Sequence, residues 1–351
     1  IEQIDGLLAD TTTGLAPAMN NFFGALQSAG DDPSSIPERQ LVLAQTDSLI
    51  NRFDVILARL DTLSRSVDQD MRSQVTSLNS LAVGVAELNS AISSATGLSS
   101  GKQPNDLLDQ RDELIRKLSE IVSLTVIGRE DGQVDILIGK GQALVVGAEV
   151  NQAVLQEADD DPSRLDIALI ENGIANNVTS EISGGDLGGL LQFRSETLQN
   201  SYNSLGRIAL TLADSVNEQH QLGMDLEGDL GGKFFVDING IDVQQRRVIP
   251  NEKNALPKDR DIGLEITDVT QLTTSEYNLI FRGPSVNDVI IEDADTGEFV
   301  TGFTLPGLFP AAIEFNGLRI NLESGSFQVG DEFLLVPTRE GGRTLELNTF
   351  R

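Results

Sequence analysis

One apolar stripe along a very long predicted helix constrains this chain more than any other feature. Between residues 36 and 92 the only glycine is Gly84 and the only proline is Pro37, which a first helical turn tolerates. Apolar residues recur there at steps of three and four, with a mean of roughly 3.6, the period of an α-helix. They are Leu60, Leu63, Val67, Met71, Val75, Leu78, Leu81, Val85, Leu88 and Ile92. At about 1.5 Å per residue such a helix is roughly 80 Å long, so the sequence predicts an elongated protein.

Three further segments carry helical stripes. The first contains Leu15, Met19, Phe22, Phe23 and Leu26 and ends at AGDDPSS; the second is NDLLDQRDELIRKLSEIV at 105–122. The third begins at about Asp186 and places apolar residues at Leu187, Leu190, Leu198, Tyr202, Leu205, Ile208, Leu212 and Val216. Because each stripe needs an apolar partner, we expect one helical bundle assembled from both sides of the region between them.

That intervening region has the period of β-strands. Residues 123–182 contain β-rich runs on either side of Asp131-Gly132, and Asn172-Gly173 follows LDIALIE. Both dipeptides suit type I′ hairpins. A second β region covers most of 232–340, with Asn316-Gly317 as another hairpin signal. Its predicted strands are GLEITDV, EYNLIFRG, DVIIEDADTGEFV, IEFNGLRINL and DEFLLVP.

These patterns together predict an α+β multidomain fold, an elongated long-helix bundle with β-rich domains inserted and appended. We expect residues 1–122 and 183–224 to form the helical bundle domain. Residues 123–182 would form a β-rich insertion and residues 225–351 a further β-rich domain. Whether the two β regions make one domain or two is left open by the pattern.

Composition excludes several classes of function. The 351 residues carry a formal net charge of -29, which repels nucleic acid and anionic membrane surfaces, and they contain no cysteine, hence no disulfide or thiolate chemistry. No run of about 18 apolar residues occurs, so no membrane span is predicted. The opening IEQIDGLLAD has neither an initiator Met nor a signal segment, which suggests a fragment or a processed form.

The charged segment 105–122 raises the question of chemistry. We expect Asn105 to be the N-cap, with ion pairs of Asp112 with Arg116 and Glu113 with Lys117. Arg111 lies on the apolar side of this helix. Its guanidinium could position a substrate carboxylate, but we favour a structural role in which it locks packed helices together.

Other candidates for a site are weak. His220 lies at a helix end and is expected to make a cap or polar contact. GKGQAL at 139–144 lacks the third glycine of a phosphate loop and is read as a turn. The loop from Asp225 departs from a calcium-binding EF-hand at Leu230 and Val236, and Asp159, Asp160 and Asp161 are consecutive, so both are expected to be solvated acidic loops. We therefore predict no catalytic, cofactor-binding or metal-binding residues and no cofactor.

Several segments nevertheless occur in a familiar order. NDLLDQRDELIRKLSEIV and GGDLGGLLQFRSETLQNSYNSLGRIALTLADSVNEQHQLGMDLEGDLGGKFF resemble the flagellar hook-associated protein 1 (FlgK) family. So do IDGLLADTTTGLAPAMNNFFGALQ and VGDEFLLVPTR. The resemblance covers about residues 1–235 well and the final β region loosely.

The resemblance implies a structural, non-enzymatic junction protein of the bacterial flagellum, secreted to the outside, that connects hook to filament through axial subunit packing. Implied partners are the hook protein, the second hook-filament junction protein, flagellin indirectly, an export chaperone for the full-length chain, and further copies of itself in a ring. The family's terminal coiled-coil segments are absent here, so we expect this chain alone to be a monomer. From the residues themselves two alternatives stay open: an extracellular adhesin or ligand-binding protein with acidic β-domain loops, and a hydrolase with paired carboxylates.

Overall fold

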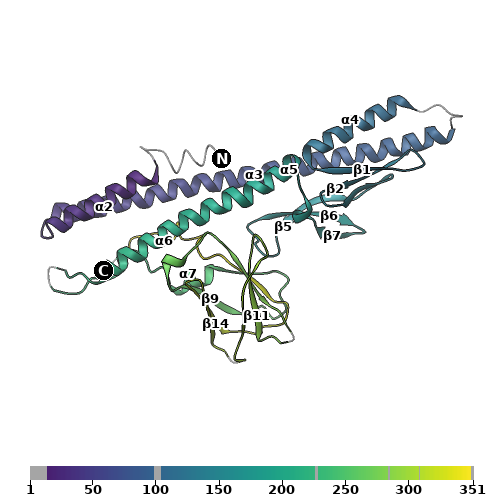
Figure 1. Cartoon of the computed structure of the whole chain (residues 1–351). Coiled ribbons are helices and arrows are strands. Elements are labelled where there is room, and N and C mark those ends of the chain that lie inside the picture. Colours follow the sequence, from purple (N-terminus) through teal and green to yellow (C-terminus); the bar gives the residue numbers. More distant parts are fainter. Residues whose placement is uncertain (1–13, 99–103, 226–227, 284, 308, 349–351) are drawn as a thin grey trace. The chain divides into compact units, whose positions relative to one another are not determined.

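The computed structural model (Figure 1) describes residues 14–98, 104–225, 228–283, 285–307 and 309–348. The chain divides into two compact units. Unit 1 comprises Ile1–Leu63, Asp159–Asp161 and Thr197–Arg351, and unit 2 comprises Ser64–Ala158 and Pro162–Glu196. The strands of the first predicted β region lie in unit 2 and those of the second in unit 1. The predicted grouping of 1–122 with 183–224 as one helical domain stays a prediction.

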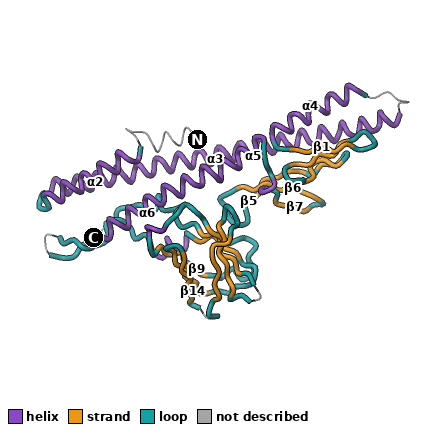
Figure 2. Tube along the Cα trace, viewed as in Figure 1, coloured by secondary structure: helices purple, strands orange, loops and turns teal. Residues whose placement is uncertain are grey.

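Helices form where the apolar stripes predict them (Figure 2). They are α2 (Leu15–Asp31), α3 (Ile36–Leu98), α4 (Asn105–Ile121), α5 (Gly185–Gln192), the π-helix η2 (Phe193–Gln199) and α6 (Asn200–Gln221). The described residues also form three short helices outside the predicted stripes: α7 (Ile241–Arg246) and the 3-10 helices η1 (Thr179–Glu181) and η3 (Val269–Gln271). With antiparallel sheets in both units, the predicted α+β fold class is confirmed. None of the described helices is long and apolar enough to cross a membrane.

The predicted stripe of α3 is its buried face. Seven of the ten stripe residues are buried, and the other three, Leu63, Leu81 and Leu88, are half-buried. The helix continues six residues beyond the predicted end at 92. Burial of a large apolar side chain contributes about 1.5–3 kcal/mol, so packing along this stripe stabilises α3 much more than helix propensity does.

The helix predicted from Asp186 is interrupted by the π-helix η2. The π-helix comprises seven residues, Phe193–Gln199. Leu187 before the interruption and Leu198 and Leu205 after it are all buried.

Unit 2 contains two antiparallel sheets. One has the strand order β1-β2-β3-β4 and the other β5-β6-β7. The strands are β1 (Leu124–Gly128), β2 (Val134–Ile138), β3 (Gln142–Val146), β4 (Glu149–Val150), β5 (Gln152–Glu157), β6 (Leu165–Glu171) and β7 (Ile174–Asn177). Alternate residues of β2 are buried, which is the burial pattern expected of a strand with one face on the core.

The predicted hairpins are present, but the type I′ turn predicted at Asp131-Gly132 is wrong. Asn172 and Gly173 have φ of 52° and 82°, and Asn316 and Gly317 have 44° and 72°, as type I′ turns require. In the turn after β1 only Gly132 has a positive φ. The Gly132 amide donates to the Arg129 carbonyl at 3.2 Å, and the Arg129 amide donates to the Gln133 carbonyl at 2.9 Å. This is a three-residue loop with glycine in the left-handed region.

Unit 1 contains a five-stranded sheet, ordered β12-β11-β10-β15-β8, and a three-stranded sheet, ordered β13-β14-β9. The strands are β8 (Val248–Pro250), β9 (Asp261–Ile266), β10 (Tyr277–Phe281), β11 (Asp288–Asp293), β12 (Phe299–Thr304), β13 (Ala311–Phe315), β14 (Leu318–Ser324) and β15 (Glu332–Leu335). DVIIEDADTGEFV, predicted as one strand, reverses direction because the Asp293 carboxylate accepts the backbone amides of Asp295 and Thr296.

Helices and sheets of unit 1 share one continuous hydrophobic core. From the sheet, alternate residues Tyr277, Leu279 and Phe281 of β10 are buried in it. From the helices, the fully buried Phe22 of α2 packs against Phe234 and Phe235, with ring centroids 6.5 and 6.2 Å away. The sheets therefore fix the position of α2, α6 and the beginning of α3.

Two details predicted for α4 are wrong. Pro104 is the N-cap, and Asn105 is the first helical residue. The pair Glu113–Lys117 is present at 3.6 Å, but Arg116 contacts Glu113 and Glu120 at 2.8 and 2.5 Å in place of Asp112. Residues at i, i+3 and i, i+4 are both neighbours on a helix surface, so the sequence alone does not decide between these partners.

Candidate functional site

Arg111 is a structural residue that joins a helix to a hairpin. Its side chain is buried, and Nη1 donates to the Gly132 carbonyl at 2.8 Å and to Asn89 Oδ1 at 3.3 Å. Asn89, fully buried on α3, also donates to the carbonyls of Val134 and Gly147, both at 2.7 Å. Asn89 was not among the residues singled out from the sequence, although an amide side chain next to an apolar stripe indicates a buried polar contact. Arg111 thus holds α4, α3 and the β1–β2 turn together.

Replacing Arg111 with alanine is expected to lower the stability of unit 2 by about 1–3 kcal/mol, because Asn89 and the Gly132 carbonyl each lose a donor. Thermal unfolding followed by circular dichroism measures the effect. Arg116→Ala, on the exposed face of the same helix, is the matched control and should shift the melting temperature little, since its ion pairs are exposed. An unchanged melt of Arg111→Ala would remove this role.

The glycine-rich segment GGDLGG, at 184–189, lies where the end of α4 packs closely against the beginning of α5. Gly185 has a φ of 59°, and a Cβ there would lie 2.4 Å from the Ile121 carbonyl carbon. The Ser123 amide donates to the Ser183 carbonyl at 2.8 Å beside it. Gly185 therefore serves close backbone packing, as does Gly188, where a Cβ would lie 2.8 Å from the Ser183 carbonyl carbon.

The other predicted candidates take up polar contacts. His220 Nδ1 lies 2.7 Å from the Gly232 carbonyl at the end of α6. The first three residues of GKGQAL form the turn between β2 and β3, and the last three belong to β3. In the loop that begins at Asp225, the Asp225 carboxylate accepts the Asp229 amide at 2.8 Å. Within the described ranges, no three Asp, Glu or His side chains are arranged to hold a metal ion, so the adhesin alternative gains no support.

Asp161 corrects the prediction of a solvated acidic loop at 159–161. Its side chain is only 1% exposed and contacts Arg339 at 2.5 Å. The side chain of Arg339 is itself 11% exposed, and its guanidinium makes a two-point contact with Glu276. Although burial lowers the pKa of Arg339, the carboxylates of Glu276 and Asp161 outweigh it and raise that pKa. Asp159 is also paired, with Lys253 at 2.6 Å.

The segment VGDEFLLVPTR contributes a charged residue to each of two buried ion-pair clusters. Arg339 is its last residue, and Asp331 near its beginning pairs with Arg260 at 2.6 Å. The Asp331 carboxylate also accepts the backbone amides of Ala255 and Gln328, at 3.0 and 2.8 Å. Both carboxylates that meet at Arg339 are buried and paired with its guanidinium, so this cluster has the character of a structural anchor and does not support the hydrolase alternative.

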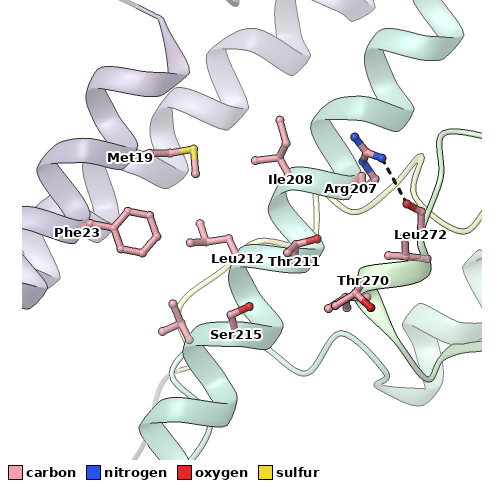
Figure 3. Close-up of a pocket in the computed structure, with 11 residues that line it drawn as sticks. Met19, Phe23, Arg207, Ile208, Thr211, Leu212, Ser215, Thr270 and Leu272 are labelled. Atoms are coloured by element: carbon pink, nitrogen blue, oxygen red, sulfur yellow. Dashed lines mark hydrogen bonds between the residues drawn. The ribbon is translucent and has the colours of Figure 1, made fainter. Parts of the chain in front are cut away.

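Unit 1 has an apolar groove beside α2 and α6. One part, with a volume of about 470 Å³, lies between α2, α6 and the segment 269–272 (Figure 3). A second part, of about 750 Å³, lies between α2, the beginning of α3 and the end of α6. The parts share Phe23, Ser215 and Val216. We call the two together the α2–α6 groove.

Phe23 is the central apolar side chain of this groove. Figure 3 shows Met19 and Phe23 of α2 facing Ile208 and Leu212 of α6. Adjacent residues of a helix point about 100° apart, so of the pair in NFFG, Phe22 enters the core and is 0% exposed while Phe23 is 47% exposed. Leu43, Ile208 and Met224 extend the exposed apolar surface along the groove.

The groove also differs in charge from the rest of the chain. Among the described residues, its lining contains the cations Arg39 and Arg207 and one acid, Asp225, in a protein with 54 acidic and 25 basic side chains. Arg207 is held by donation to the Leu272 carbonyl at 3.4 Å. Exposed apolar surface rimmed by polar residues is typical of a protein-binding site, and here the rim favours an acidic partner.

A long-helix α+β subunit with such a groove is typical of structural proteins that pack against other proteins. Residues 1–235 match the family described as the flagellar hook-associated protein FlgK helical domain. The chain therefore belongs to the FlgK family of flagellar hook-associated proteins.

Individual relatives agree with this assignment. The chain is 32% identical to flagellar hook-associated protein 1 of Salmonella typhimurium, over 96% of this chain and 59% of that protein. It is 30% identical to the Escherichia coli protein of the same name, over 97% of this chain and 60% of that protein. The solved structure of the flagellar hook junction protein FlgK from Burkholderia pseudomallei superposes with a TM-score of 0.85 at 31% identity, over 96% of this chain and 59% of that one. The chain thus spans about three fifths of the length of these relatives.

Proposed function

We propose that this chain is part of a structural junction protein of the bacterial flagellum, located outside the cell, that connects hook to filament and has no catalytic activity. The match of residues 1–235 to the FlgK helical domain carries the proposal. The names of the relatives, hook-associated and hook junction protein, support it. The hook protein and the second junction protein are then the axial partners, flagellin is an indirect partner, and an export chaperone binds the full-length chain before secretion.

Within that role, we assign the α2–α6 groove to contact with a neighbouring copy of the same protein in a ring. A second copy has 54 acidic side chains, and carboxylates on its facing surface can pair locally with the cationic lining residues Arg39 and Arg207. Apolar area at Phe23 contributes affinity, while the two arginines restrict which partner surfaces fit. Because an exposed ion pair contributes at most about 1 kcal/mol, the apolar part of the groove is expected to supply most of the binding energy.

The substitution Phe23→Glu in the full-length protein of the parent bacterium tests the groove. It places a carboxylate in an apolar contact that faces an acidic partner, so filaments are expected to be lost or greatly shortened. Phe23 is half-exposed, so the isolated chain should lose only about 1 kcal/mol of stability. Electron microscopy of cells and a thermal melt of the purified variant measure the two effects.

Ile241→Glu is the matched control, since Ile241 is 73% exposed in unit 1 and does not line the groove. A glutamate there also suits the first turn of α7. This variant should assemble normal filaments. Normal filaments with Phe23→Glu would exclude the groove as a subunit contact and leave the junction role itself untouched.

A further inference from the structure

The chain contains three Asn-Gly dipeptides in very different surroundings. They are Asn172-Gly173, Asn239-Gly240 and Asn316-Gly317. Asparagine followed by glycine is chemically labile, because glycine lacks the side chain that would hinder its own amide nitrogen from approaching the preceding asparagine side chain. The fold therefore decides which of the three can react.

We propose that Asn172 is a site of spontaneous deamidation in the folded protein. Asn172 and Gly173 form the exposed two-residue turn between β6 and β7. A Cβ added to Gly173 would find no atom within 4 Å, so the space beside the reacting amide is open. In a type I′ turn the ladder hydrogen bonds join the flanking residues, and the amide of the second turn residue is not one of their donors.

The reaction uses only the chain and water. The Gly173 nitrogen loses its proton to base and attacks Cγ of Asn172, forming the new C–N bond of a succinimide. The side-chain nitrogen leaves as ammonia, which takes up a proton. Water then opens the ring at either carbonyl, giving aspartate or isoaspartate. No oxidant, reductant or metal takes part.

The other two sites are held against this reaction to different degrees. At Asn239 both reacting groups are engaged, because the side chain exchanges hydrogen bonds with the Ile266 backbone at 2.8 and 2.9 Å and the Gly240 amide donates to the Asp237 carbonyl at 3.1 Å. At Asn316 the turn is exposed, but the Gly317 carbonyl accepts the amides of Thr267 and Asp268 at 2.9 and 3.1 Å. The expected order of rates is Asn172, then Asn316, then Asn239.

The product would alter the edge of a sheet. Glu171 and Ile174 are directly paired, so the turn between them contains only two residues. Isoaspartate adds one methylene to the main chain of this turn. All four residues of β7 are exposed, so little packing opposes their separation from β6. Each event also changes the formal charge from -29 to -30.

Incubation of the purified chain in mildly alkaline buffer, followed by peptide mapping with mass spectrometry, tests the proposal. In folded protein Asn172 should deamidate at least roughly tenfold faster than Asn239, because local opening is much cheaper at an exposed hairpin tip than in a hydrogen-bonded site. In urea the three rates should become similar. Asn172→Gly, which keeps a glycine-tolerant turn, should remove the early product from its peptide.

Two results would overturn the proposal. One is an Asn172 rate in folded protein no higher than that of Asn239. The other is the same order of rates in urea, since this would assign the difference to local sequence and not to the fold. Binding or filament assays do not enter the test, so its outcome is independent of the proposed junction role.

Discussion

Replacing Gly206 with alanine is expected to destabilise unit 1 by about 3 kcal/mol, the upper range for overpacking a close contact. Gly206 lies in the middle of α6, where alanine would otherwise favour the helix by about 1 kcal/mol. A Cβ at this position would lie 1.7 Å from the Thr338 carbonyl oxygen and 3.2 Å from the Gly341 amide. Since both are backbone atoms, no side-chain rotation relieves the clash. The segment around 338–341 must move away from α6.

The sign of this effect separates packing from helix propensity. Gly24→Ala in α2 is the matched control, because a Cβ there meets no atom within 4 Å. That variant should be as stable as the parent or slightly more stable. By calorimetry Gly206→Ala should lower the melting transition of unit 1 by roughly 6–12 °C, at about 2–4 °C per kcal/mol for a unit of this size. A rise in the melting temperature of Gly206→Ala would refute the close contact.

Replacing Arg339 with methionine is expected to cost about 3–5 kcal/mol, because it removes the guanidinium that contacts the buried carboxylates of Asp161 and Glu276. Asn203, which donates to Glu276 Oε1 at 3.2 Å, and Gln199, which also donates to Glu276, do not neutralise the charge. Arg339→Lys keeps one charge but loses the two-point contact, so it should fall between the parent and the methionine variant.

Arg343→Met is the control for this prediction. Arg343 lies four residues further along, pairs with Asp61 at 2.6 Å and is 39% exposed. Exposed pairs contribute about 0–1 kcal/mol, so denaturant unfolding should show a small shift for Arg343→Met and a large one for Arg339→Met. Equal shifts would contradict the assignment of Arg339 as a buried anchor.

The sequence predicted those parts of the fold that a local pattern specifies. The apolar period of α3 determines which face is buried, and Asn-Gly between two predicted strands favours the positive φ angles seen at residues 172–173 and 316–317. Arg111 was recognised because a guanidinium on an apolar face needs partners.

Features that depend on distant residues could not be predicted. Asp161 lies in a run of three aspartates and gives no local sign that Arg339, 178 residues away, neutralises it. Likewise, the pattern of α2 shows that Phe22 and Phe23 are both apolar but not which of them enters the core. The α2–α6 groove combines α2, α3 and α6, so it exists only in the folded unit.

Immunogold electron microscopy of flagella isolated from the parent bacterium tests the central claim, that this chain is part of a hook-filament junction. The antibody is raised against residues 14–348. Gold particles confined to the boundary between hook and filament, and absent from flagella of a deletion strain, are the predicted result. Label along the whole filament, or none on flagella that contain the protein by mass spectrometry, would contradict it.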